Sequence, residues 1–160
     1  MRRRPLIPFL SFVVFLASFT IAHAEVSFVR VWPGWVDADA FDTISEYFTG
    51  REHTGKRVIQ RSHPDARPGF YFLARVANTG ADISNARFAL HVILPGNPEP
   101  KTFTFPASLP ARSTVFQLGL TGPDWPDRDI HPVAWKLELL SATDELLASE
   151  QSFLWSKPAK

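Results

Sequence analysis

Apolar and polar residues alternate along much of this chain, and clusters of turn-forming residues interrupt the alternation. Successive side chains of a β-strand point to opposite faces of a sheet, so this period of two predicts strands with one buried face. The cleanest example has four apolar residues at every second position: Val133, Trp135, Leu137 and Leu139. Trp135 is the expected anchor of the core. No strands alternate with long helical segments, so a parallel α/β sheet is disfavoured.

Seven segments are predicted as strands. The first alternates Val26, Phe28, Arg30 and Trp32 with the residues between them, and it is expected to break at Pro33-Gly34. The second, Phe70 to Val76, is apolar on both faces, which is typical of a central strand. The others cover residues 87–94, 103–105, 112–120, 133–139 and 146–155. Short strands at roughly 8–12-residue spacing predict an antiparallel β-sandwich or barrel.

One segment departs from the strand pattern. Phe41, Ile44 and Phe48 have helical spacing, and an aspartate at position 37 or 39 is able to cap the start. The sequence therefore predicts a short helix or helical turn within residues 37–48, inserted among the strands.

Residues 68–156 resemble the immunoglobulin-like sandwich modules of exported bacterial proteins. The similar features are the strand and turn Phe72-x-Ala74-x-Val76-x-Asn78-x-Gly80, and the closing hairpin from Trp135 to Trp155. The resemblance implies an immunoglobulin-like antiparallel sandwich of about seven strands. It implies no activity, because this fold hosts many unrelated functions. The chain has no cysteine, so it does not belong to the antibody branch with its disulfide between sheets.

Residues 1–24 have the order of a secretory signal peptide. Three arginines follow Met1, an apolar run covers residues 9–22, and Ala22-His23-Ala24 has the small-x-small pattern of a cleavage site. The run is shorter than the roughly 20 residues that a transmembrane helix needs. The sequence therefore predicts export to the periplasm or the extracellular space, without a stable membrane anchor after cleavage. One domain is expected over residues 25–156, followed by a tail at 157–160.

Cleavage would change the charge of the protein. The whole chain carries 17 Lys and Arg against 16 Asp and Glu, and loss of the three leading arginines leaves 14 against 16. The net charge of the mature chain is then −2, which argues against nucleic acid as a partner.

The residues that carry chemistry form no known catalytic or metal-binding motif, and no cofactor is expected. A site from Glu52, His53, His63 and Asp65 requires the loop to fold back, and solvated loop residues explain the same pattern. Asp124, Asp127 and Asp129 lack the order of a calcium-binding loop. The sequence therefore predicts a protein that is not an enzyme.

A basic segment between residues 51 and 67 has five cationic residues against two acidic ones. The cationic residues are Arg51, Lys56, Arg57, Arg61 and Arg67. One interpretation is a site for phosphate or carboxylate groups on an envelope polymer, a lipid head group or an acidic protein. The other is a charged edge strand, which discourages aggregation and needs no ligand. The second interpretation is preferred from the sequence alone.

Three tryptophans lie beside proline or glycine, where their rings are candidates for exposure: Trp32, Trp35 and Trp125. Exposed aromatic rings stack on sugars, whereas buried ones plug the ends of a sandwich, and burial is the commoner role. The first functional hypothesis is an exported, non-enzymatic binding or interaction module for an unidentified protein or envelope polymer. The alternative is a carbohydrate-binding domain that uses these tryptophans.

Overall fold

The computed structural model describes residues 25–41 and 56–156. The described residues form eight strands: β1 (Val26–Val36), β2 (Arg57–Arg61), β3 (Gly69–Asn78), β4 (Ile83–Leu94), β5 (Asn97–Leu109), β6 (Thr114–Thr121), β7 (Ala134–Leu140) and β8 (Leu146–Gln151). Two short 3-10 turns, η1 (Ala38–Phe41) and η2 (Gly122–Asp124), complete the regular structure. The prediction of an all-β chain is confirmed. Each of the seven predicted segments contains a strand, and β2 is an additional strand within the basic segment.

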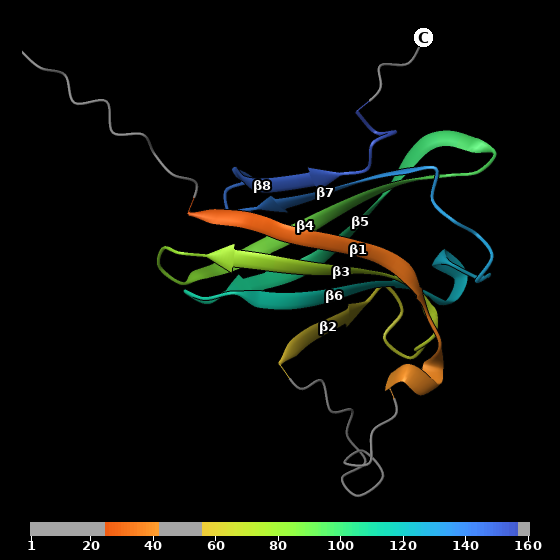
Figure 1. Cartoon of the computed structure of the whole chain (residues 1–160), viewed down its shortest axis with the longest axis horizontal. Helices are drawn as coiled ribbons and strands as arrows, with labels where there is room; N and C mark the ends of the chain where they lie inside the picture. The colour runs from red at the N-terminus through yellow and green to blue at the C-terminus, as the bar shows by residue number, and fades with distance from the viewer. Residues whose placement is uncertain (1–24, 42–55, 157–160) are drawn as a thin grey trace, which may run out of the picture.

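The strands form two four-stranded sheets that lie face to face (Figure 1). Sheet A has the order β1-β3-β6-β2, and sheet B has the order β5-β4-β7-β8. Neighbouring strands are antiparallel except β2 and β6, which are parallel. Strands β1 and β8 contact each other along one side of the molecule, so β2 and β5 are the edge strands of the opposite side.

The core lies between the two sheets and is built from alternate residues of each central strand. Phe72 of β3 and Leu90 of β4 are fully buried. The ring centroids of Phe88 and Phe116, which come from different sheets, lie 4.9 Å apart. Burial of large aromatic and aliphatic side chains is the main stabilising contribution in a chain without cysteine. The period of two that predicted these strands therefore also identifies most of the core.

Strand β7 differs from the prediction at its start. Leu137 and Leu139 are fully buried as expected, but Trp135 is only half-buried. Its ring packs edge-on against Phe72, with the ring centroids 5.5 Å apart. Val133 lies before the strand and is 45% exposed, so its predicted inward position is wrong. The Val133 N–H still donates to the Ile93 carbonyl at 2.8 Å, so backbone pairing continues beyond the buried part of the strand.

Strand β1 corrects two predictions. A bulge at Val29 changes the register, so Val26 and Phe28 face the core whereas Arg30 and Trp32 face outward. The predicted break at Pro33-Gly34 is absent, because β1 pairs only with β3 and an edge strand tolerates a proline without an N–H group.

The predicted helical segment is only partly within the described residues. Its first part forms η1, whose Phe41 is buried, and residues 42–48 lie outside the described part of the chain.

Candidate functional site

The outer face of sheet A carries a row of arginines that runs across the strands. Arg30 of β1 pairs with Arg75 of β3, Arg75 pairs with Val115 of β6, and Val115 pairs with Arg57 of β2. Residues that are directly opposite in a ladder have side chains on the same face. Three arginines from three strands therefore lie in one line, which we call the basic row.

The spacing of the basic row follows from the sheet. Adjacent strands lie about 4.8 Å apart, so Arg30 and Arg75 start from neighbouring strands and Arg57 starts roughly 10 Å beyond Arg75. All three side chains are exposed. The row is thus open to solvent along its length, on a surface with the rigidity of a paired sheet.

The basic row has no counter-charge among the residues that the structure describes. No strand residue on the outer face of sheet A is Asp or Glu, and none of the three arginines forms an ion pair within residues 25–41 and 56–156. The Arg30 guanidinium lies over the ring of Trp32, 4.9 Å from its centroid. This contact orients Arg30 but leaves its charge uncompensated.

A second cross-strand row on the same face, two rows away from the basic row, holds neighbouring segments in place. Tyr71 is buried in this row, and its ring centroid lies 5.1 Å from that of Phe41. Gly119 lies on its other side and has no side chain, which leaves room for the phenol ring. Arg61 donates from Nε to the Tyr71 hydroxyl at 2.8 Å, and its guanidinium lies 4.7 Å from the Phe41 ring centroid. The hydroxyl in turn donates to the carbonyl of Arg67 at 2.6 Å. This row holds η1 and the end of β2 against β3.

The structure divides the five cationic residues predicted from the basic segment. Arg57 belongs to the basic row, and exposed Lys56 immediately precedes it. Arg61 donates to the Tyr71 hydroxyl, and the backbone carbonyl of Arg67 accepts a hydrogen bond from the same hydroxyl. Arg51 lies outside the described residues.

Sequence reasoning missed Arg30 and Arg75. The bulge at Val29 hid Arg30, because strict alternation placed it on the same face as Val26. A signal for Arg75 was present: it is the only charged residue in the apolar segment 70–76 and must therefore face out of the core.

The three candidate tryptophans occupy different environments. Trp125 is 2% exposed, and its ring stacks on Phe70 at 4.7 Å, so it is not available as a platform for sugars. Trp35 packs against the core, and its Nε1 donates to Asp37 at 2.8 Å. Trp32 is 39% exposed and lies beside the basic row under Arg30.

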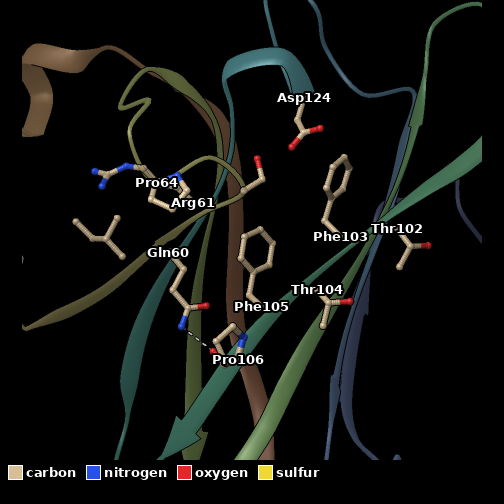
Figure 2. A pocket seen from close by; sticks show the side chains of 11 residues that line it. Gln60, Arg61, Pro64, Thr102, Phe103, Thr104, Phe105, Pro106 and Asp124 are labelled. Carbon is tan, nitrogen blue, oxygen red and sulfur yellow. Dashed lines mark hydrogen bonds between the residues drawn. The ribbon is translucent and has the colours of Figure 1, made fainter.

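A groove separates the two edge strands β2 and β5. It encloses about 640 Å³ and is lined by Ile59 to Ser62 of the β2 side, by Thr102 to Pro106 of β5 and by Pro64 and Asp124 (Figure 2). Gln60 donates from Nε2 to the Pro106 carbonyl at 2.6 Å and so bridges the sheets. A smaller hollow of about 270 Å³ is also lined by Gln60 and Pro106.

The outer face of sheet B carries a chain of polar contacts. His91 lies 2.8 Å from the Thr102 hydroxyl through Nδ1 and 3.0 Å from the Glu138 carboxylate through Nε2. The Lys136 ammonium hydrogen bonds to the same carboxylate and is the main cause of a lowered Glu138 pKa; partial burial opposes this shift, and His91 adds to it. We interpret these residues as a cross-strand ladder, because they lie on three adjacent strands.

The remaining candidates for chemistry stay apart. Glu52 and His53 are outside the described residues, whereas His63 Nε2 lies 3.1 Å from the Asp124 carboxylate in the loops above the groove. Within residues 25–41 and 56–156, no three histidine or acidic side chains are close enough to share a metal ion. The same part of the chain contains no helix that is long and apolar enough to cross a membrane.

No protein-family model matches this chain, and no curated protein has a matching sequence. The proposals therefore depend on the geometry of the basic row and of the groove alone.

Proposed function

We propose that this protein is an exported, non-enzymatic binding module with an immunoglobulin-like topology, and that the basic row binds a ligand with several phosphate or carboxylate groups. The observation that carries the proposal is the alignment of Arg30, Arg75 and Arg57 from three strands that contribute no acidic residue to this face. Guanidinium groups bind both anions through paired hydrogen bonds.

The strand order supports the immunoglobulin-like assignment. In that fold strands A, B and E share one sheet, and strands C′, C, F and G form the other. The order β1-β3-β6 matches the first set and β5-β4-β7-β8 matches the second. The position beside strand E is taken here by β2, which comes from the connection between β1 and β3 and runs parallel to β6. This departure is what brings Arg57 into the basic row.

The energetics favour a functional interpretation of the row over a charged edge. Arginine at a sheet edge discourages aggregation, which explains Arg57 alone. Arg75 lies on central strand β3, and Arg30 is its direct partner. Like charges directly opposite in a ladder are destabilising, so neither position benefits from arginine through folding. A ligand that supplies the missing negative charges accounts for both.

The test compares two double variants of the full mature chain. Arg57→Gln/Arg75→Gln removes two charges from the basic row, and Lys101→Gln/Arg128→Gln removes two exposed charges from outside sheet A. We expect the first variant to bind immobilised heparin about tenfold more weakly, since two exposed charge contacts contribute roughly 1.5 kcal/mol together. The control should change binding by less than twofold. Equal losses in the two variants would contradict the proposal.

Two further probes distinguish the source of the anion. Vesicles containing an anionic phospholipid present phosphate on a membrane surface, whereas heparin presents sulfate and carboxylate on a soluble polymer. Exposed charge contacts weaken with ionic strength, so binding at the basic row should fall as salt rises. Salt-independent binding of a neutral glycan that is lost in Trp32→Phe would instead support the carbohydrate alternative, which now depends mainly on Trp32.

A further inference from the structure

The free edge of β5 faces the groove between the two sheets. The Pro106 carbonyl points across the groove, because it accepts the hydrogen bond from Gln60 (Figure 2). In an antiparallel ladder the N–H and C=O groups of alternate residues point to the same side. The backbone groups of Thr104 and Thr102 therefore also point away from β4 and into the groove, and both residues line it.

Proline placement agrees with this direction. Pro106 has no N–H group to offer, and its position facing the free edge leaves the ladder with β4 intact. Thr102 and Thr104 thus present the pattern of donors and acceptors that an additional strand requires.

The side chains around the groove indicate the character of the occupant. Phe103 and Phe105 contribute apolar surface, and the Asp124 carboxylate lies at one end (Figure 2). The Arg61 guanidinium is directed to Tyr71 on the outer face of sheet A, and His63 Nε2 contacts the Asp124 carboxylate at 3.1 Å. The groove is therefore partly apolar and has one carboxylate, shared with a histidine, at one end.

We propose that this groove binds an extended peptide segment of a partner protein, which adds a strand to the free edge of β5. The segment pairs with Thr102 and Thr104 and places a lysine or arginine near Asp124. Main-chain hydrogen bonds supply the affinity in this mode of recognition, and the flanking side chains supply the specificity. This site is separate from the basic row, so the two proposals stand or fall independently.

The test uses a short synthetic peptide of alternating valine and threonine that ends in lysine, added to the full mature chain. Amide hydrogen exchange at Thr102 and Thr104 is followed by NMR. We expect roughly tenfold slower exchange at both amides when the peptide is bound. The amides of Phe103 and Phe105 pair with β4 and serve as internal references that should not change.

Matched variants separate backbone pairing from other contacts. Thr104→Pro removes the N–H that faces the groove, whereas Thr104→Val keeps it and removes only the exposed hydroxyl. We expect at least about a tenfold loss of peptide affinity in the proline variant and less than about a twofold loss in the valine variant. Far-ultraviolet circular dichroism establishes that both variants are folded.

The charge of the peptide provides a further comparison. Asp124→Asn should weaken binding of the lysine-ended peptide severalfold and leave a glutamine-ended copy unaffected. Unchanged exchange at Thr102 and Thr104 at saturating peptide, or equal affinity of both Thr104 variants, would overturn the proposal. Protection that rises with protein concentration in the absence of peptide would assign the edge to a second copy of this chain and would also overturn it.

Discussion

Arg30 and Arg75 are direct cross-strand partners in the β1–β3 ladder, and both side chains lie on the outer face of sheet A. Trp32 covers one side of the Arg30 guanidinium, and no carboxylate in the described residues pairs with either arginine. A like-charge pair in this position opposes folding. The basic row therefore lowers the stability of the sheet that holds it.

The first prediction concerns this pair. Arg75→Gln should raise the free energy of unfolding by a few tenths of a kcal/mol, because it removes the repulsion with Arg30. Urea denaturation at low ionic strength measures the change, and added salt should reduce it, since salt screens exposed charges. A destabilisation of about 1 kcal/mol or more would mean that Arg75 is structural, contrary to our interpretation.

The second prediction concerns the space above Gly119. A Cβ atom at this position would overlap the Tyr71 ring, which Phe41 and the hydrogen bonds of its hydroxyl hold in place. Gly119→Ala should therefore destabilise the protein by about 1–3 kcal/mol in urea denaturation.

Gly34→Ala is the matched control for this substitution. Gly34 lies in the same cross-strand row, opposite Tyr71, but a Cβ atom there meets no atom within 4 Å. We expect no loss of stability from this control. Similar effects of the two substitutions would show that the packing of Tyr71 is not the cause.

The third prediction concerns Gln117, which is 5% exposed and lies between Leu73 and Ile59 in its row. Its Oε1 is buried and has no hydrogen-bond partner within residues 25–41 and 56–156. Gln117→Leu should stabilise the protein by roughly 1 kcal/mol, because the cost of the unsatisfied acceptor disappears and the volume is similar.

Thermal and urea denaturation measure this effect. Gln151→Leu, on the exposed surface of β8, is the control and should change stability by less than about 0.5 kcal/mol. If Gln117→Leu is destabilising, the amide has a role that its surroundings do not reveal.

The fourth prediction is a dependence on pH. The hydrogen bond from Lys136, supported by His91, holds the pKa of the Glu138 carboxyl below its ordinary value. The folded chain therefore binds this proton less readily than the unfolded chain does. The resulting stabilisation is present above the ordinary pKa and is lost as the pH falls through the lower, folded value.

Glu138→Gln should accordingly be less stable than the natural chain above pH ~5, and the difference should shrink toward pH ~3. Urea midpoints across this range provide the measurement. Glu150→Gln is the comparison, because Glu150 is exposed and has no ion pair in the described part of the chain. A Glu138→Gln deficit that is constant with pH would contradict the assigned cause.

The sequence predicted the strands well because each strand is a local pattern. Phe70 to Val76 is apolar on both faces and forms the central strand β3, whereas the residues around Leu137 alternate and bury Leu137 and Leu139. The outward position of Arg75 was readable in the same way. What failed locally was β1, where one extra residue in a bulge reversed the faces of Arg30 and Trp32.

The candidate site could not be predicted from the sequence, because it is formed by pairing between segments that are distant along the chain. Arg30, Arg57 and Arg75 are neighbours only because β1, β2 and β3 join one sheet, and β2 reaches it through a parallel contact with β6. The groove has the same origin, since β2 and β5 face each other only after the sheets pack. Side-chain periodicity is fixed within a strand, whereas the order and register of strands depend on long-range contacts that no single segment encodes.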